Sequence, residues 1–382
     1  MIPDDDQKAL GEAARKFSRE VLLPGYLKRD KATCWDRDLA REMGGLGLLG
    51  VSLPEEVGGL GERSVTLGIV TEELGYGDYN VSQLPINVCL NASILLRSAP
   101  KHIVEEWVPQ MLTGDKLMAI CLTEPRGGSD AANIQLRAHR SGDDYILNGE
   151  KTSITFAGDA DIFLVFARTG TVEDGAKGVT AFFVTEGTKG ISRSRFDDVG
   201  SRIIGRGSLF FEDVVVPARN RVGDEGKGFT QVMQGFDYSR ALLGLQACGA
   251  AQASLDEAWA YAKEREAFGR PIGQFQGVSF PLAEGESKIA AIRQLCYHTL
   301  ELRDAGLEHT AQSAMCKSMG PETAFNVIHQ CLLTFGHYGW TMETAHQQRM
   351  RDVMGQEIGD GTANIMKQII SRSRIGRAAI QY

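Results

Sequence analysis

The chain has 382 residues, and because 43% of them are hydrophobic it can bury the cores of two or three domains. Its formal net charge of −8 disfavours a general nucleic-acid-binding protein, which needs a clustered basic surface, but it is compatible with one basic pocket for a phosphorylated small molecule. The seven cysteines include no C-x-x-C pair and the seven histidines are dispersed, so neither a disulfide framework nor a metal site is expected.

The start of the chain and its hydropathy predict a cytoplasmic protein. MIPDDDQKAL has neither a basic start nor an apolar run, so no signal peptide is expected. No stretch of about 18 consecutive apolar residues occurs, so no membrane-spanning helix is expected either.

Residues 1–118 are predicted to form an N-terminal all-helical domain. In QKALGEAARKFSREVLL, apolar residues recur every three or four positions, which is the spacing of one helix face. Asp36–Met43 and Ser64–Gly75 show the same spacing, and the loop-like SLPEEVGGLGE separates them.

Residues 119–225 are predicted to form a middle β domain. Runs rich in Val, Ile, Phe and Thr (DIFLVFA, GVTAFFVTE and GSLFFEDVVVP) alternate with Gly- and Asp-rich breaks. This pattern is typical of the strands of a compact antiparallel domain.

Residues 226–382 are predicted to form a C-terminal four-helix bundle, which makes the whole chain an α+β multidomain protein. Four long segments joined by short links keep a helical pattern, as in an up-and-down bundle. These segments are Leu242–Arg265, Ser279–Ala305, Ala311–Phe335 and Asn364–Ile380.

Several common nucleotide-binding and catalytic motifs are missing. No strand is followed by G-x-G-x-x-G at the start of a helix, and Gly226-Lys227 lacks the residues of a phosphate-binding loop. Neither H-E-x-x-H nor G-x-S-x-G occurs. A Rossmann domain, a zinc hydrolase and an α/β-hydrolase are therefore not supported.

A series of short segments is more informative. The first, LTEPRGGSD at 122–130, has two glycines that allow a flat or phosphorylated ligand to approach closely, although alone it could equally be an ordinary turn. It is followed by NGEK at 148–151, FEDV at 211–214, RxxFGRPI at 265–272, and RD and DGT at 351–352 and 360–362. This ordered set resembles the flavin-dependent acyl-CoA dehydrogenase family, and the resemblance covers essentially the whole chain.

The resemblance implies a fold, a cofactor and a reaction. Members of the family have an N-terminal helical domain, a middle β-barrel-like domain and a C-terminal four-helix bundle, and most are homotetramers built from dimers. They bind FAD, remove the α-proton of an acyl-CoA thioester and pass the β-hydride to flavin N5. An electron-transferring flavoprotein is the usual electron acceptor.

The resemblance also implies which residues contact FAD. Three positions depart from the family pattern and weaken the assignment there, because Ser153 replaces a large aromatic residue, Leu333 replaces Gln, and His337 follows Gly336 in place of a second glycine. Arg265, Phe268 and Gln276 would reach FAD from a neighbouring subunit. The full set of implied FAD contacts is Ile120, Leu122, Thr123, Gly128, Ser129, Ser153, Ile154, Thr155, Arg265, Phe268, Gln276, Gly336, Thr362 and Asn364.

A second set of residues is expected to bind the acyl-CoA. Arg240 carries a planar guanidinium that suits phosphate or carboxylate partners, although a structural salt bridge is the alternative. Asn87 and Asn91 would bound the acyl end of the pocket, unless they are ordinary exposed helix residues. The implied substrate contacts are Ser129, Phe236, Asp237, Ser239, Arg240, Asn87, Asn91 and Gly361.

Asp360 is the expected catalytic base. Relatives usually have Glu-Gly-Thr in this turn, and the Glu takes the α-proton; here the carboxylate is one methylene shorter, which removes roughly 1.5 Å of reach. Some relatives supply the base from the bundle helix at the position of Ser239, which cannot act as a carboxylate. Glu357 is expected to lie outside the thioester site, and an inactive homologue with a degenerate turn is the alternative interpretation.

The shorter base suggests a substrate that is wide near the thioester. Cyclohexane-1-carboxyl-CoA dehydrogenases are similar in having Asp in this turn, so the sequence predicts oxidation of cyclohexane-1-carboxyl-CoA to cyclohex-1-ene-1-carboxyl-CoA. The thioester oxygen would be held by the backbone N–H of Asp360 and a ribityl hydroxyl of FAD. Three alternatives remain: a dehydrogenase for a short or branched acyl-CoA such as isobutyryl-CoA, a flavin monooxygenase or oxidase, and a non-catalytic CoA-binding protein.

Overall fold

The computed structural model describes residues 2–32 and 34–379, and its N-terminal part is helical. Asp4 caps the first helix by accepting a hydrogen bond from the Gln7 backbone N–H, while the Gln7 side chain accepts one from the Asp4 N–H. The helices are α1 (Asp5–Phe17), the π-helical turn η1 (Ser18–Leu22), α2 (Leu23–Arg29), α3 (Arg37–Gly45), the 3-10 turn η2 (Glu55–Val57), α4 (Ser64–Gly77), α5 (Gln83–Ser98) and α6 (Lys101–Leu112).

The middle part is a twisted sheet of eight strands. Its strands are β1 (Met118–Cys121), β2 (Arg137–Ser141), β3 (Asp144–Ile154), β4 (Ile162–Arg168), β5 (Val179–Thr185), β6 (Ile191–Arg195), β7 (Gly207–Pro217) and β8 (Arg221–Val222). They follow the order β6-β7-β3-β2-β4-β5-β8, with β1 beside β4. The prediction of an antiparallel domain is confirmed only in part: five strand pairs of the sheet are antiparallel, but β1 and β2 both pair with β4 in parallel.

Strand β4 of the sheet is covered on both faces, and 3-10 turns connect several of the other strands. Every residue of β4 is buried, which agrees with its continuous apolar sequence. The 3-10 turns are η3 (Gly175–Gly178), η4 (Arg202–Ile204) and η5 (Ala218–Asn220).

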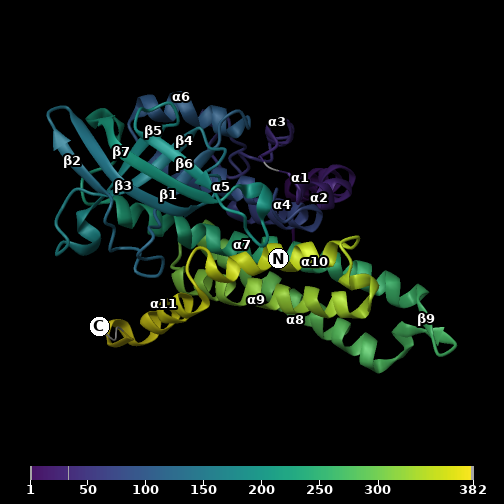
Figure 1. Cartoon of the computed structure of the whole chain (residues 1–382). Helices are drawn as coiled ribbons and strands as arrows, with labels where there is room; N and C mark the ends of the chain where they lie inside the picture. The colour runs from purple at the N-terminus through teal and green to yellow at the C-terminus, as the bar shows by residue number, and fades with distance from the viewer. Residues whose placement is uncertain (1, 33, 380–382) are drawn as a thin grey trace.

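The C-terminal part is a bundle of long helices. Its elements are α7 (Gly228–Glu264), the short hairpin β9 (Glu266–Ala267) and β10 (Arg270–Pro271), η6 (Ile272–Gln274), α8 (Gln276–Asp304), α9 (Thr310–Thr334), η7 (Tyr338–Trp340), α10 (Ala345–Ile358), α11 (Ala363–Ile375) and η8 (Gly376–Ala379). Figure 1 shows the bundle beneath the other two parts, with the β9 hairpin at one end and α11 at the other.

Two helix predictions in this part need correction. Helix α7 begins at Gly228, well before Leu242, because the buried face of its first turns consists of Gly228, Val232 and Gly235, and two glycines give no apolar stripe in the sequence. The fourth bundle helix is α10, which packs on α9 and α7, and not the predicted Asn364–Ile380. Helix α10 escapes prediction because the residues that it buries, among them His346, Gln348 and Asp352, are polar. Helix α11 ends at Ile375, and Ile380 lies outside the described residues.

Helix α7 joins the three parts of the molecule. It packs against α4 and α5, against the bundle helices α8 and α9, and against β5. Glycines allow the closest crossings: a Cβ at Gly75 of α4 would lie 2.6 Å from the Gln246 carbonyl oxygen of α7. In the same helix, Tyr238 shares a hydrogen bond of 2.7 Å with Ser52 and Arg240 reaches the Asp360 carbonyl at 3.5 Å, so residues 236–240 lie between the N-terminal part and the α10–α11 turn. In the described part of the chain, no helix is both long and apolar enough to cross a bilayer.

Candidate active site

Asp360 lies in the turn between α10 and α11. It has φ of +53°, a left-handed conformation that Asp adopts more readily than most residues, and Gly361 follows with φ of +98°. Thr362 then caps α11 by accepting a hydrogen bond from the Ile365 N–H at 3.5 Å. The turn therefore presents Asp360 in a fixed, strained position, as functional residues often are.

The Asp360 carboxyl group is half-buried, and among the described residues no donor hydrogen-bonds to it. Burial raises the pKa of Asp360 above its ordinary value, while the nearby charges of Lys317 and Arg240 oppose that rise. A raised pKa and a carboxylate with unused acceptor sites are the properties of a general base.

Lys317 of α9 contacts the same turn and was not among the predicted residues. Its ammonium donates to the Gly361 carbonyl at 2.5 Å and to the Glu357 carbonyl at 3.4 Å. Burial lowers the pKa of Lys317 to about 8, so the amine is still mostly charged at neutral pH. The one signal in the sequence is a lone charge in the otherwise small and apolar SAMCKSMG.

The predicted substrate residues of α7 face this turn. Arg240 is buried, donates to Asp237 at 3.1 Å and reaches the Asp360 carbonyl at 3.5 Å. The Ser239 hydroxyl donates to the Phe236 carbonyl at 3.4 Å, and Phe236 is half-buried. The ion pair with Asp237 agrees with the alternative interpretation of Arg240, and the second contact adds that Arg240 borders the Asp360 turn.

Asn87 and Asn91 are buried in α5, so the alternative that they are exposed helix residues is wrong. The Asn91 amide nitrogen donates to the Asn87 carbonyl at 2.9 Å and to the Met118 carbonyl of β1 at 3.4 Å. The side-chain oxygens of both residues have no hydrogen-bond partner among the described residues. Buried, unpaired oxygens are costly, and a polar ligand or water would satisfy them.

The predicted flavin contacts of the middle part form one group. The Thr152 N–H donates to the Thr123 carbonyl at 2.9 Å, which places Leu122 and Thr123 beside the end of β3 that carries Ser153 and Ile154. The buried Lys151 fixes this segment by donating to the Leu122 carbonyl at 2.9 Å and to Glu124 at 2.7 Å. Burial lowers the pKa of Lys151 to about 8, against the opposing charge of Glu124.

The donors of this group fit a flavin. The side-chain hydroxyls of Thr123, Ser129, Ser153 and Thr155 have no hydrogen-bond partner elsewhere in the described residues, and Ser153 has φ of +56°. Gly128 and Ser129 are exposed, Ile120 is half-buried in β1, and Ile154 is buried. The chain therefore offers uncommitted donors beside an apolar surface, as an isoalloxazine ring requires.

The remaining predicted flavin contacts divide between the two ends of the bundle. Phe268 is 95% exposed beside the β9–β10 hairpin, with Arg265 and Gln276 also exposed nearby. Gly336 lies at this end too, because Phe335 stacks on Tyr261 near the end of α7. Figure 1 places this hairpin far from the sheet and α11, so within one chain these residues do not meet Thr123, Thr362 or Asn364.

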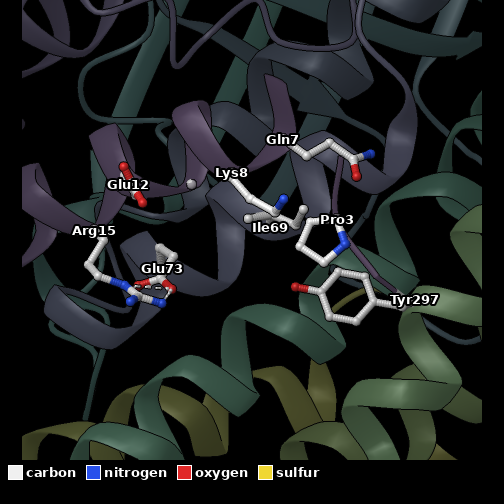
Figure 2. Close-up of a pocket in the computed structure, with 9 residues that line it drawn as sticks. Pro3, Gln7, Lys8, Glu12, Arg15, Ile69, Glu73 and Tyr297 are labelled. Carbon is white, nitrogen blue, oxygen red and sulfur yellow. Dashed lines mark hydrogen bonds and ion pairs between the residues drawn. The ribbon is translucent and has the colours of Figure 1, made fainter. Parts of the chain in front are cut away.

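A separate surface pocket of about 300 Å³ lies between α1, α4 and α8. Figure 2 shows its lining, in which Arg15 is paired with Glu73. None of the predicted site residues lines it, so it is not part of the site around Asp360.

Comparisons with known proteins match nearly the whole chain to one protein family. Residues 4–115, 119–214 and 226–375 match the N-terminal, middle and C-terminal domain families of acyl-CoA dehydrogenase. The short-chain specific acyl-CoA dehydrogenase of Clostridium acetobutylicum is 33% identical over 96% of this chain and 97% of its own length.

Solved structures agree with these matches. Butyryl-CoA dehydrogenase from Megasphaera elsdenii is 32% identical, with a TM-score of 0.94 over 98% of this chain and 99% of that one. A glutaryl-CoA dehydrogenase from Mycobacterium smegmatis in complex with FADH2 is 26% identical, with a TM-score of 0.93 over 99% and 97% of the two chains. None of these names refers to a cyclic acyl group.

Proposed function

Because the chain belongs to the acyl-CoA dehydrogenase family, as an FAD-dependent oxidoreductase, we propose that it desaturates an acyl-CoA thioester with Asp360 as the base. Asp360 takes the proton from the α-carbon, and its backbone N–H donates to the thioester oxygen as negative charge develops there. FAD, when bound, accepts the hydride from the β-carbon. The observation that carries this role is the Asp360 carboxyl group, which has no hydrogen-bond donor among the described residues and has a raised pKa.

We propose cyclohexane-1-carboxyl-CoA as the substrate, with cyclohex-1-ene-1-carboxyl-CoA as the product. The shorter side chain of Asp360 leaves room beside the α-carbon, which in a cyclic substrate carries a ring. A short or branched acyl group is the second candidate, and the short-chain and butyryl-CoA relatives favour it.

The proposed enzyme works as a homotetramer built from dimers, with electrons leaving to an electron-transferring flavoprotein. Figure 1 shows the β9 hairpin, which carries Phe268, at the end of the bundle far from the sheet, and this separation supports a second copy of the chain at each flavin. Proposed domain limits are 1–118, 119–225 and 226–382. Flavin packing would change at three positions, which are the small Ser153, Leu333 and His337, while the other proposed contacts stay.

An anaerobic spectral titration tests the proposal. Purified, yellow protein is mixed with cyclohexanecarboxyl-CoA, butyryl-CoA or isobutyryl-CoA, and flavin absorbance is followed. Bleaching is expected at the lowest concentration with the cyclic thioester, and a product with one new double bond should appear. Preferred bleaching by butyryl- or isobutyryl-CoA would select the second candidate. Rapid peroxide release in air would instead indicate an oxidase, and a colourless protein would contradict the proposed chemistry.

A further inference from the structure

Lys317 is the buried charge that the proposed reaction leaves unexplained. It is 1% exposed, and among the described residues no carboxylate lies within ion-pair distance of its ammonium. Burying a lysine without a paired carboxylate is unfavourable, so a residue in this state needs a compensating contact. Its contacts are the carbonyl oxygens of Glu357 and Gly361, which lie on either side of Asp360.

We propose that Lys317 is a positioning residue that clamps the Asp360 turn in its active conformation and keeps the Asp360 carboxyl group ionised for proton abstraction. The proposal rests on the assignment of Asp360 as the base. It adds a residue whose hydrogen bonds go to the backbone of the turn.

The clamp follows from geometry. The Glu357 carbonyl belongs to the last turn of α10, where carbonyl groups lack partners within the helix, and a cation is favourable at a helix C-terminus. The Gly361 carbonyl lies beyond the strained Asp360. By bonding both carbonyls from α9, one ammonium fixes the turn on both sides and opposes relaxation of Asp360 to an ordinary backbone conformation.

The electrostatic part follows from the groups that face Asp360. Helix α9 supplies the Lys317 charge, and α7 supplies Arg240, whose charge is partly balanced by Asp237. Helix α10 supplies Glu357, and Tyr79, between α4 and α5, supplies a buried neutral phenol. Lys317 is therefore the one cation facing Asp360 without a paired carboxylate among the described residues, and its removal must raise the pKa of Asp360.

Three variants of the full-length, flavin-loaded enzyme test the proposal. Lys317→Met removes the charge and both hydrogen bonds, Lys317→Gln keeps a donor without the charge, and Lys101→Met removes an exposed charge on α6 as a control. Flavin content, KM and the rate of anaerobic flavin reduction are measured between pH 5.5 and 9. The same acyl-CoA is used throughout.

Lys317→Met should bind flavin, change KM less than about threefold, and slow flavin reduction by roughly 10- to 100-fold at pH 6.5. Its acidic limb should move to higher pH by about one unit, since one opposite charge is lost. Lys317→Gln should show the same shift with a smaller loss of rate, and Lys101→Met should match the wild type.

An unchanged pH profile and rate in Lys317→Met would overturn the proposal, as would failure of both Lys317 variants to fold with flavin, which would make the residue merely structural. Asp360→Asn separates a failure of the base assignment from a failure of the role proposed for Lys317. If it keeps full activity, the assignment of the base fails. If it is inactive while Lys317→Met resembles the wild type, only the role of Lys317 fails.

Discussion

Asp360 and Asp352 belong to the same short segment of chain, yet their surroundings are opposite. Asp352, in α10, is fully buried and accepts hydrogen bonds from Tyr26 Oη at 2.6 Å, Asn80 Nδ2 at 2.9 Å and the Ser201 N–H at 2.5 Å. Asp360 accepts no hydrogen bond at its carboxylate from the described residues and faces two cations instead. A carboxylate whose acceptor sites are filled holds structure together, whereas one with open sites can take a proton from a substrate.

Asp352 and Asp360 also differ in the parts of the molecule that they connect. Tyr26 lies in α2, Asn80 lies in the turn between α4 and α5, and Ser201 comes from a loop of the sheet domain. Asp352 therefore connects all three parts at one point. Asp360 lies beyond this anchor. Helix α10 is therefore held at Asp352, and the turn that carries Asp360 follows this fixed point.

The strongest test of this contrast is Asp360→Asn, which keeps the shape of the side chain and removes its basicity. The rate of flavin reduction should fall by about 100- to 10,000-fold, the value of a positioned base, while flavin content stays the same. Stopped-flow reduction by acyl-CoA measures the effect. Glu105→Gln, which changes an exposed carboxylate on α6, is the control and should keep the wild-type rate.

Changing a partner of Asp352 should affect stability far more than chemistry. Tyr26→Phe removes a buried hydrogen bond to a carboxyl group and should lower the free energy of unfolding by about 1.5–3 kcal/mol, with flavin reduction changed less than about threefold. Denaturant titration gives the first value. Tyr76→Phe, which removes an exposed hydrogen bond to Asp256, should cost much less, and equal losses in the two variants would contradict the structural role of Asp352.

Lengthening the base tests whether its size selects the substrate. Asp360→Glu should lower the ratio of cyclohexanecarboxyl-CoA to butyryl-CoA turnover by roughly tenfold, because about 1.5 Å of added reach occupies the space proposed for the ring. The ratio of kcat/KM for the two thioesters measures this. If the ratio does not change, the size argument is wrong, although Asp360 can still be the base.

Some features of the fold and of the candidate site could be predicted from the sequence, and others could not. The strands around β4 could be predicted because continuous apolar runs are buried on both faces, and Asp360 could be proposed as the base because it lies in a short motif that resembles the family. Helix α10 was missed because its buried face carries His346, Arg349 and Asp352, which look like surface residues in sequence. In the structure Arg349 pairs with Glu257 of α7, and Asp352 accepts a hydrogen bond from Tyr26 of α2.

Lys317 was missed for a related reason. Its partners are backbone carbonyls, which leave no pattern in side-chain types. Similarly, the burial of Asn87 and Asn91 could not be predicted, because α5 is covered on more than one side and has no polar face to mark its exposed surface.

A further expected effect is a pH dependence of stability that comes from Asp352. Burial raises the pKa of Asp352 to about 7, from about 3.9 in an unfolded chain, and the nearby Asp78 and Asp30 add to the rise. Between these values the folded state holds a proton that the unfolded state has lost. The stability contributed by Asp352 is therefore full below about pH 4 and is lost as the pH rises through about 7, with a slope of at most about 1.4 kcal/mol per pH unit.

Asp352→Asn removes this titration, since an amide resembles the protonated acid at every pH. The wild type should lose stability relative to the variant between pH 4.5 and 8, and unfolding midpoints across that range measure the difference. Asp256→Asn, at an exposed site, should run parallel to the wild type. A wild type that instead gained stability over the variant as the pH rose would mean that the Tyr26, Asn80 and Ser201 donors hold Asp352 ionised, and the contrast with Asp360 would then lie in their hydrogen bonds alone.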